Sequence, residues 1–488
     1  MTHPLLDTHR ATLDGALHAI ATRGYWSPHS EMPSPKVYGE TAAADGQAAV
    51  QAHLGRPFAL DQPGQTGWGG REASPYGMAL DVRFPVCDPE ALLAAGQAAM
   101  KGWQAVGAAG RTGICLEMLE RLNRQSFEIG HAVMMTTGQG WMMAFQAGGP
   151  HAQDRALEAI AVAWKAMADV PAEAVWEKPQ GKHAPAVLHK RFEIVGRGVA
   201  LVIGCATFPT WNTYPGLFAA LATGNPVIVK PHPNAVLPAA LTVSVLRDVL
   251  TEQGLDPNLV TLAVSDKPEL TQALATHAAV ASIDFTGGNA FGQWLQSNAP
   301  QARLYAEMAG VNLVVIESTD AYAGMLRNLA LSLSLYSGQM CTTTQNLLIP
   351  AGGIETDQGH KSFEQVGADL AAAIDQLLAD PKVAFTVLGA IGSAQTVERV
   401  EQAATVGRAV RASQKLTHPE YPQAEVRPIP DLEWSDDFDA ALIVSEHAAL
   451  RDALDACDVV RNRYLSDDCS PEAQRRLVED VVYLLART

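Results

Sequence analysis

The fold is decided by the stretch Val199-Ala-Leu-Val-Ile-Gly-Cys-Ala-Thr-Phe-Pro209 and by Asn225-Pro-Val-Ile-Val-Lys-Pro231, which follows it. Short aliphatic and β-branched runs predict strands at 199–203 and 227–229, with a helix near 214–222 between them. The alternation continues with helices at 234–253, 268–277 and 290–297 and strands at 259–263 and 280–285. Strands that alternate with helices build parallel sheets, so we expect an α/β fold with ligands at the carboxyl ends of its strands.

The regions around this core have weaker patterns. Residues 1–80 are helical over 13–21 and then rich in Pro, Gly and Trp as far as Trp68-Gly-Gly-Arg71. We interpret them as an irregular surface arm and oligomer contact, or as a loosely packed extension. Further helices are expected at 89–140, 152–168, 325–335, 363–378, 396–409, 441–453 and 471–485, and further strands at 304–306 and 311–316, with a charged strand-like excursion at 178–197.

Composition limits the function classes. At 488 residues the chain is long enough for two or three domains. Its net charge of −17 disfavours nucleic acid and anionic membranes as partners, because both repel an acidic protein. No apolar run approaches the ~18 residues that span a bilayer, and the N-terminus lacks a secretory pattern. The 6 cysteines form no Cys-x-x-Cys pair, which argues against a zinc site and favours the reducing cytoplasm.

Two residues suggest covalent chemistry on a carbonyl group. Cys341 lies in Ser337-Gly-Gln-Met-Cys-Thr-Thr343, a small-residue turn that can expose a thiol. Glu307 lies in Ala306-Glu-Met-Ala-Gly310, 34 residues (341 − 307) earlier. A thiol nucleophile with a carboxylate base, after a nucleotide-binding pattern, suits oxidation of a carbonyl through a covalent intermediate. Cys205 is the rival nucleophile, since it follows the strand at 199–203.

The candidate cofactor site lacks the Gly-x-Gly-x-x-Gly fingerprint. Instead, Phe285-Thr-Gly-Gly-Asn-Ala-Phe-Gly292 ends a strand and opens a helix, where free N–H groups and the helix dipole favour a pyrophosphate. Lys230 closes the strand at 227–229. It is either a solvated surface lysine or a cofactor contact.

These motifs, in this order, resemble the aldehyde dehydrogenase superfamily over roughly residues 80–430. Within it, Thr207, the run from Gly338 to Asn346 and the Trp-rich arm look most like the phenylacetic acid degradation aldehyde dehydrogenases. The resemblance implies an aldehyde dehydrogenase-like fold with a Rossmann-like cofactor domain, an α/β catalytic domain and a small bridging or oligomerisation hairpin. The expected bounds are an N-terminal arm 1–80, a cofactor-binding domain 81–177 and 198–306, a hairpin 178–197, a catalytic domain 307–430 and a divergent C-terminal tail 431–488.

The resemblance also implies catalytic roles. Cys341 would attack the aldehyde, and Glu307 would activate water to hydrolyse the thioester. Thr207 stands where the family has an oxyanion-binding asparagine, so either Thr207 or the downstream Asn212 would donate to the oxyanion. Phe208 would line the acyl pocket. No metal is expected.

The implied cofactor is NADP or NAD. Lys230 would bind the adenosine ribose, and the pyrophosphate would lie against a turn that consists of Thr286, Gly287, Gly288 and Gly292. Pro233 occupies the place of a family glutamate that contacts the ribose hydroxyls. Because a carboxylate repels a 2′-phosphate, we expect NADP to be used at least as well as NAD.

Three functions remain open. The first is oxidation of a semialdehyde from aromatic degradation, either free or CoA-bound, by a cytoplasmic homodimer or dimer of dimers. The second is a CoA-acylating relative, and the third is a non-catalytic paralogue that acts in binding or assembly. The third is motivated by Thr207 and by a missing family segment, Glu-x-Phe-Gly-Pro, beyond the cysteine.

Overall fold

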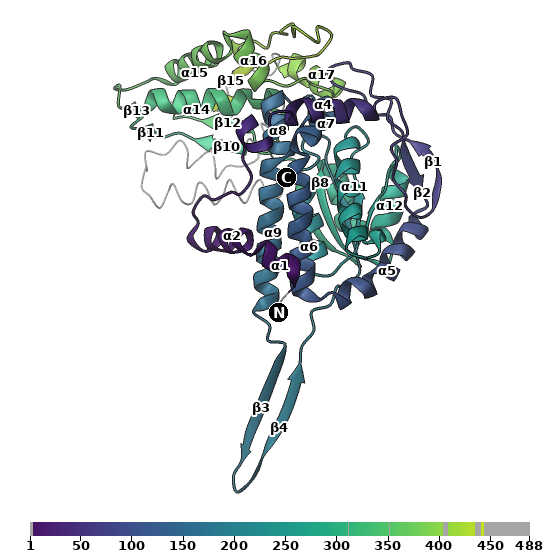
Figure 1. Ribbon diagram of the computed structural model, residues 1–488. Coiled ribbons are helices and arrows are strands. Elements are labelled where there is room, and N and C mark those ends of the chain that lie inside the picture. The colour runs from purple at the N-terminus through teal and green to yellow at the C-terminus, as the bar shows by residue number, and fades with distance from the viewer. Residues whose placement is uncertain (1–2, 311, 351, 404–407, 435–440, 444–488) are drawn as a thin grey trace. The chain divides into compact units, whose positions relative to one another are not determined.

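The computed structural model describes residues 3–310, 312–350, 352–403, 408–434 and 441–443 (Figure 1). The chain divides into two compact units. Unit 1 comprises described residues of 1–73, 79–137 and 141–308, and unit 2 comprises 74–78, 138–140 and the described residues from 309 onward.

The centre of unit 1 is a five-stranded parallel sheet in the order β7-β6-β5-β8-β9. Every residue of β5 and β6 is buried, as expected for parallel strands that are covered on both faces. The sheet grows from β5 through β6 to β7, and the chain then crosses β6 and β5 to add β8 and β9 on the other side of β5. The strand order therefore reverses between β5 and β8. The strands are β5 (Val199–Ile203), β6 (Val227–Lys230), β7 (Val260–Leu262), β8 (Val280–Gly287) and β9 (Arg303–Met308).

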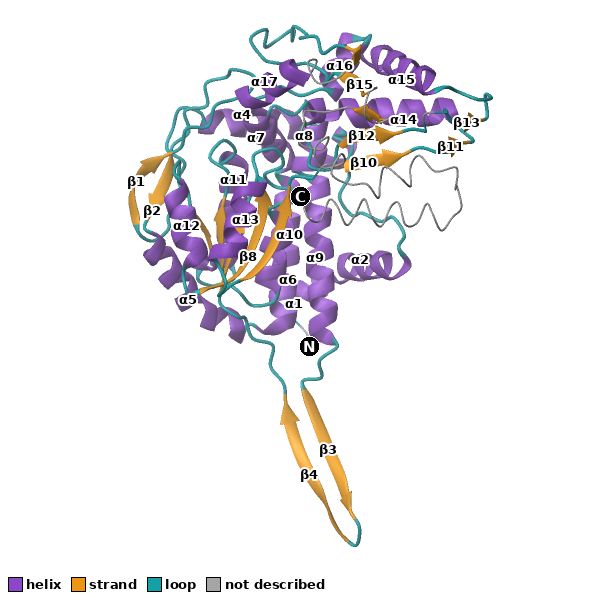
Figure 2. Cartoon of the chain, turned by 180° about the vertical axis from the view of Figure 1, so that it is seen from behind, coloured by secondary structure: helices purple, strands orange, loops and turns teal. Residues whose placement is uncertain are grey.

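Helices cover both faces of this sheet (Figure 2). Residues of α5, α12 and α13 share one apolar core with Leu201, Ile283 and Phe285. On the other face α10 packs against β5 and β6, with α6 and α9 behind it. These helices are α5 (Pro89–Ala105), α6 (Gly107–Arg124), α7 (Ser126–Thr137), α8 (Trp141–Gly148), α9 (Pro150–Ala168), α10 (Tyr214–Ala222), α11 (Leu237–Glu252), α12 (Pro268–Thr276) and α13 (Asn289–Asn298), with a 3₁₀ turn at Pro257–Leu259.

The N-terminal segment is packed into unit 1, unlike the irregular arm or loose extension that the sequence suggested. Leu6, Leu13 and Val50 are each fully buried, and α1 lies against α6. Apolar burial of this kind offsets the entropy of ordering the segment. Its elements are α1 (Pro4–Thr8), α2 (Arg10–Thr22), α3 (Pro35–Tyr38), α4 (Ala42–His53), β1 (Gln65–Gly69) and β2 (Phe84–Cys87).

A two-stranded hairpin leaves unit 1 at the end of α9. Strands β3 (Glu173–Gln180) and β4 (His183–Arg191) pair only with each other and project away from the helices (Figure 1). The strand signal at 178–197 was therefore correct in kind but began five residues too late (178 − 173). The turn contains Gly181 at φ +65°, a conformation that glycine adopts without strain.

Unit 2 contains a mixed sheet in the order β10-β12-β16-β15-β14, in which only β10 and β12 are parallel. Its core joins α14 and α15 to these strands, and Ser362 and Gln365 form a capping box at the start of α15. The elements are β10 (Asn312–Val315), β11 (Ser318–Thr319), α14 (Tyr322–Ser334), a 3₁₀ turn at Leu335–Gly338, β12 (Thr344–Leu348), β13 (Glu355–Thr356), α15 (Phe363–Leu378), α16 (Pro381–Val387), α17 (Ala394–Ala403), β14 (Arg408–Arg411), β15 (Asp431–Trp434) and β16 (Ala441–Ile443).

Two short segments from early in the chain belong to unit 2. Tyr76 donates its hydroxyl to Gln139 O (2.9 Å), and Gln423 Nε2 donates to Tyr76 O (2.7 Å). Ala390 N donates to Gly138 O (2.7 Å). Unit 2 is therefore completed by residues that precede most of unit 1 in the sequence.

Most predicted elements are confirmed, including the 363–378 helix with identical bounds. Two were wrong. Residues 408–411 form strand β14 instead of the end of a helix, and 441–443 form strand β16 instead of the start of one. Both segments pair in the unit 2 sheet, and such pairing overrides local helical preference. The rest of the predicted tail, 444–488, lies outside the described residues.

Over the described ranges, no helix is both long and apolar enough to cross a membrane. Within those same ranges, no group of three or more His, Cys, Asp or Glu residues is arranged to hold a metal ion.

The contact between α1 and α6 leads to a stability prediction. A Cβ atom at Gly113 would lie 2.4 Å from Leu6 N and 2.9 Å from Leu5 C, both backbone atoms. We expect Gly113→Ala to lower the free energy of unfolding by about 1–3 kcal/mol through overpacking, measured by urea denaturation. Gly102→Ala, in α5 with open space around its Cβ, is the matched control and should stabilise by up to ~1 kcal/mol. Equal effects of the two substitutions would contradict this account.

Candidate active site

The predicted cofactor residues gather at one edge of the unit 1 sheet. Ile203, at the end of β5, is in register with Lys230 of β6 and with Phe285 of β8. Because the three strands are parallel, the residues that follow them emerge at the same edge. The loops after β5 and β8 therefore lie on either side of the point where the sheet changes direction.

The turn after β8 suits an anion. A Cβ at Gly292 would lie 2.4 Å from Met308 Sδ, and one at Gly287 would lie 2.7 Å from the Phe285 ring, so a larger residue at either position would displace a neighbouring side chain. Helix α13 starts after Gly288 with no side chain bonded to its first N–H groups. Thr286 Oγ1 is buried without a hydrogen-bond partner among the described residues. Free N–H groups and an unpaired hydroxyl beside a ten-residue helix fit a pyrophosphate.

Lys230 is buried, with 6% of its surface exposed, and its Nζ donates to Pro231 O (2.9 Å). Burial lowers the pKa of Lys230 to about 8, although the nearby Asp266 acts in the opposite direction. Burial and the charges of Lys230 and Arg71 lower the pKa of His232 to about 4. The solvated-surface interpretation of Lys230 was thus wrong, and its contact with the adenosine ribose stays a prediction.

Glu72 is a candidate site residue that the sequence did not reveal. It is 8% exposed, and its Oε1 accepts from Leu237 N (2.8 Å) and from Val236 N at the start of α11. Burial raises the pKa of Glu72 to about 7, against the effect of these two backbone donors. Its Oε2 is buried without a partner in the described part of the chain. The Glu72 carboxyl therefore lies at the N-terminus of α11, close in sequence to Pro233, which has replaced the carboxylate expected at that position.

The loop after β5 is organised around the Cys205 thiol. Asn212 Nδ2 donates to Cys205 Sγ (3.3 Å), and so does Phe208 N (3.4 Å). Thr207 Oγ1 lies 3.6 Å from the same sulfur and is half-buried. The amide of Asn212, one of the two expected oxyanion donors, is thus used inside the loop and is only 7% exposed. Thr207 is the more accessible of the two.

Glu307 ends β9, the edge strand, and 62% of its side chain is exposed. Its Oε1 lies 3.9 Å from Arg155 Nη2, which comes from α9. The Arg155 guanidinium also lies over the Trp211 ring, 5.1 Å from its centroid. Glu307 therefore has access to solvent and one charged neighbour at the limit of an ion pair.

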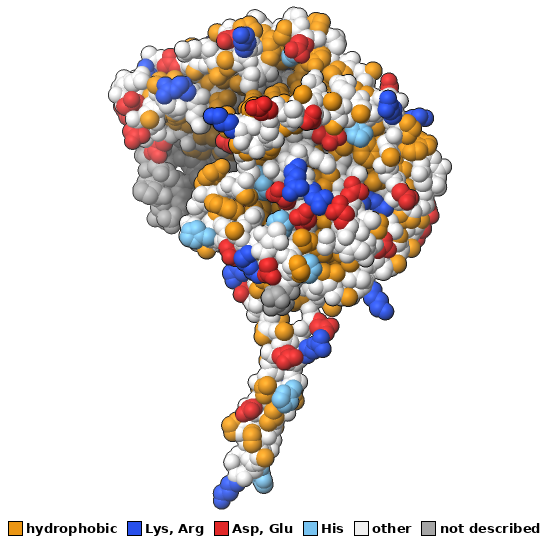
Figure 3. All heavy atoms as spheres, in the orientation of Figure 1, with side chains coloured by type: hydrophobic (Ala, Val, Ile, Leu, Met, Phe, Trp, Pro, Cys, Tyr) orange, Lys and Arg blue, Asp and Glu red, His pale blue; other side chains and the backbone are white. Residues whose placement is uncertain are grey.

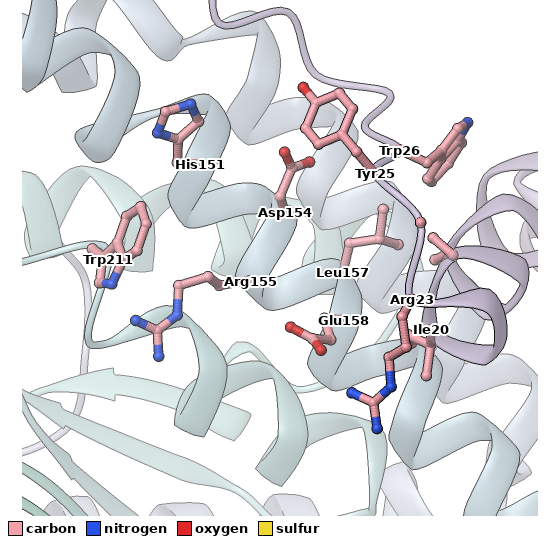
Figure 4. A pocket seen from close by; sticks show the side chains of 13 residues that line it. Ile20, Arg23, Tyr25, Trp26, His151, Asp154, Arg155, Leu157, Glu158 and Trp211 are labelled. Carbon is pink, nitrogen blue, oxygen red and sulfur yellow. The ribbon is translucent and has the colours of Figure 1, made fainter. Parts of the chain in front are cut away.

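A cavity of about 410 Å³ opens beside this group, between α2, α9 and the loop that carries Trp211 (Figure 4). Arg155 belongs both to the cavity wall and to the pair with Glu307. The wall combines aromatic and charged side chains: Arg23, Tyr25, Trp26, His151, Asp154, Arg155, Glu158 and Trp211, with Ala16, Ala19, Ile20, Gly24 and Leu157.

In unit 2, Cys341 is exposed on a turn that its surroundings hold in place. Asn312 Nδ2 donates to Cys341 O (2.7 Å) and to Thr343 O (3.1 Å). Before it, Tyr336 (φ 54°), Ser337 (φ 53°) and Gly338 (φ 73°) are all left-handed. That conformation is unfavourable for a tyrosine and often marks a functional segment. Ser337 Oγ holds it by donating to Gly389 O (3.0 Å).

The described units bring the predicted residues together in part. Unit 1 holds the Thr207 and Phe208 loop, Lys230, the glycine turn after β8 and Glu307, all next to the carboxyl ends of its strands. Cys341 belongs to unit 2. Its pairing with Glu307 stays a prediction that rests on the sequence motifs.

Comparison with known proteins identifies related chains. Residues 85–423 match the model of the aldehyde dehydrogenase family. The crystal structure of an NAD-dependent aldehyde dehydrogenase from Burkholderia multivorans is 54% identical with a TM-score of 0.86, over 88% of this chain and 77% of that one. A Thermus 1-pyrroline-5-carboxylate dehydrogenase with bound NAD shares the fold at 17% identity, with a TM-score of 0.62 over 82% of this chain and 77% of that one.

Curated relatives are more distant in sequence. The N-succinylglutamate 5-semialdehyde dehydrogenase of Chromobacterium violaceum is 26% identical over 325 residues, which is 66% of this chain and 60% of that protein. The enzyme of that name from Burkholderia mallei is 30% identical over 48% of this chain and 47% of its own length. The chain thus spans about half to three fifths of these relatives' length.

The burial of the cysteines predicts an order of reactivity. Cys341 is exposed, Cys205 is half-buried, and Cys87 and Cys115 are buried. Burial raises the pKa of Cys87 and raises that of Cys115 to about 12, so few thiolates form there. We expect iodoacetamide to modify Cys341 about tenfold faster than Cys205, and the two buried thiols only after denaturation. Peptide mass spectrometry over time measures this, and faster labelling of Cys205 would contradict it.

Proposed function

Because this chain belongs to the aldehyde dehydrogenase family, we propose that it catalyses the NAD-dependent oxidation of an aldehyde to an acid through a cysteine thioester. The observation that carries the proposal is the exposed Cys341 thiol on a turn fixed by Asn312, within the matched residues 85–423. An exposed thiol on a rigid turn can meet a carbonyl carbon without rearrangement of the backbone.

The proposed roles follow from the chemistry of each side chain. The Cys341 thiolate forms a C–S bond to the aldehyde carbon, and the oxygen becomes an oxyanion that accepts hydrogen bonds from Cys341 N and Thr207 Oγ1. NAD, when bound, would accept the hydride that leaves this carbon as the oxyanion re-forms the C=O bond, which leaves a thioester on Cys341. Glu307 then takes a proton from water, the water oxygen attacks the thioester carbon, and the C–S bond breaks to release the acid. Exposure of Glu307 at the end of β9 supports this role, since the carboxylate needs access to water.

The cofactor site supports NAD more than NADP. The expectation of NADP use rested on Pro233, which removes a carboxylate from the loop after Lys230. Glu72 returns a carboxyl group to the start of α11, where its charge would repel a 2′-phosphate. The unpaired Thr286 hydroxyl and the uncapped start of α13 fit the pyrophosphate of either cofactor.

We propose a semialdehyde as the substrate class. The sequence motifs favour a semialdehyde from aromatic degradation, whereas the curated relatives are named for N-succinylglutamate 5-semialdehyde. The cavity beside Arg155 supports a substrate with a planar part and an acid group, because Trp26, Trp211 and two arginines line it. Asp154 and Glu158 in the same wall would repel a second acid group on the substrate. This favours semialdehydes from aromatic degradation over N-succinylglutamate 5-semialdehyde.

The two alternative functions predict different behaviour. A CoA-acylating enzyme would release the acyl group to CoA and would not need Glu307. A non-catalytic paralogue would bind cofactor without forming an acyl adduct. The acidic, exposed Glu307 and the exposed Cys341 favour hydrolytic catalysis over both.

We further propose that the protein is a homodimer or a dimer of dimers, with the β3–β4 hairpin as a contact. Val175, Trp176, Val187, Leu188 and Phe192 are 43–58% exposed on or beside the hairpin, and apolar side chains run along its length (Figure 3). A two-stranded ribbon is marginally stable alone in water. Contact with a second copy would cover these apolar groups and its unpaired strand edges.

The proposed roles predict distinct variant behaviour. With NAD and an aromatic semialdehyde, Cys341→Ala should lose at least about 10³-fold in kcat and form no acyl adduct. Glu307→Gln should lose about 10²–10⁴-fold and accumulate an adduct on Cys341, since only deacylation needs the base. NADH absorbance and intact-protein mass spectrometry measure both. Cys205→Ala is the control and should still form the adduct on Cys341. Adduct decay that depends on CoA would favour the acylating alternative, and no adduct in the wild type would favour the non-catalytic one.

The position of Glu72 predicts cofactor preference. We expect a higher kcat/KM and tighter binding for NAD than for NADP. Glu72→Gln removes the charge and should lower the ratio of kcat/KM for NAD to that for NADP about tenfold. Because the carboxyl is charged above its pKa of about 7, discrimination should grow as pH rises through this value. Thermal-shift titration with each dinucleotide measures binding without turnover. Asp256→Asn, which removes a carboxylate from another turn of unit 1, should leave the ratio unchanged; equal binding of NADP by the wild type would refute the proposal.

A further inference from the structure

A second carboxyl group lies near Glu307 in unit 1. In the β8–β9 pair, Asp284 is in register with Tyr305, and Thr286 is in register with Glu307. Paired residues and residues two apart along a strand face the same side of a sheet, so Asp284 and Glu307 are diagonal neighbours on one face. The alternate residues, Ile283 and Phe285, face the apolar core on the opposite side.

Asp284 is half-buried, whereas Glu307 is exposed. On β5 its register neighbour is Val202, and on α10 a Cβ at Gly216 would lie 2.5 Å from the Asp284 Cγ. Neither β5 nor α10 contains a charged residue, and the Tyr214 hydroxyl of α10 is bonded to Thr242. Over the described residues, no hydrogen bond involves the Asp284 carboxyl. Its surroundings therefore offer little stabilisation to a negative charge except through Arg155 of α9.

Among the described residues, Arg155 is the cation that acts on both carboxyls. It pairs with Glu307 at 3.9 Å and stabilises the charged form of Asp284. Its guanidinium is also held over the Trp211 ring, and Figure 4 shows it extending from α9 toward Trp211, away from Asp154 and Glu158. Of those two α9 carboxylates, Asp154 is bonded to His29 (2.7 Å). One cation thus acts on two carboxyl groups, of which Glu307 is the more exposed to water.

We propose that Asp284 is a positioning residue for the proposed base Glu307, and that it acts by competing for Arg155. This inference rests on the proposed function. When Asp284 is protonated, Arg155 interacts with Glu307 alone, which stabilises the carboxylate and weakens it as a base. When Asp284 releases its proton to solvent, Arg155 is shared and the added negative charge increases the proton affinity of Glu307. The ionisation of one carboxyl would then prepare the other to accept a proton from water.

The direction of this effect in pH is set by the surroundings of Asp284. Burial, and then repulsion from Glu307, raise the pKa of Asp284 to about 7, while Arg155 lowers it. Below this value Asp284 is neutral, and above it Asp284 is charged. Deacylation should therefore accelerate as pH rises through about 7. Two interacting carboxyls titrate as a pair, so a rate profile reports their joint behaviour.

The test isolates deacylation from cofactor binding. The enzyme is acetylated on Cys341 with p-nitrophenyl acetate and desalted, and loss of the acetyl mass is followed at several pH values. In the wild type we expect the rate to rise about tenfold from about pH 6 to about pH 8, because the ionised fraction of a carboxyl with a pKa of about 7 rises by this factor over that range. Asp284→Asn should remain at the low-pH rate throughout. Arg155→Met removes the cation that lowers the pKa of Asp284 and should move the rise to higher pH.

Matched controls separate this effect from a general loss of buried charge. Burial also raises the pKa of Asp431 to about 7, and Arg411 opposes this, so Asp431→Asn removes a similar carboxyl from unit 2 and should keep the wild-type pH profile. Circular dichroism verifies that each variant is folded. If Asp284→Asn does not fold, the pH profile of Arg155→Met still tests the inference independently. A normal adduct with an unchanged profile in both variants would overturn this inference alone. Absence of any adduct on wild-type Cys341 would overturn the proposed function as well.

Discussion

The parallel pairing of β5 with β6 and β8 is the constraint on which the site depends. Its register places Ile203 beside both Lys230 and Phe285, so the loops that follow these strands begin at one edge. A slip of one residue would exchange the faces of a strand and turn the side chains of its core residues toward the other helical layer. The packing of the aliphatic side chains of these strands fixes the register, and the register in turn brings the candidate cofactor residues together.

Three charged groups of unit 1 lie where burial makes their charge costly. Glu72, Lys230 and Asp284 all have pKa values moved toward neutrality, in each case chiefly by burial. A carboxyl with a raised pKa in the folded state contributes stability that is lost as pH rises toward that pKa. Such groups reduce stability at neutral pH, which is characteristic of functional sites more than of structural ones.

The sequence predicted what local patterns encode. Apolar periodicity located the strands of the unit 1 sheet, the helices between them and two helices of unit 2, α14 and α15. Motif spacing singled out Glu307 and Cys341. The sequence did not reveal Glu72, because the two backbone N–H groups that donate to its carboxyl belong to residues 164 and 165 positions later in the chain. Asp284 was hidden for a similar reason, since its importance comes from register with β9 and from Gly216 on α10. The misassigned segment at 441–443 was helical by local preference and became a strand through pairing with β12 and β15.

The composition of unit 2 has a consequence for how the chain is made. Gln423 reaches Tyr76 across 347 residues of sequence, and Gly138 bonds to Ala390. During synthesis, residues 74–78 and 138–140 leave the ribosome long before the segment that they complete, so they must wait unpaired while unit 1 forms around them. Closing such long loops is slow. A fragment cut out at residue 309 would also lack part of its own interior, so the boundary in space cannot serve as a boundary for expression.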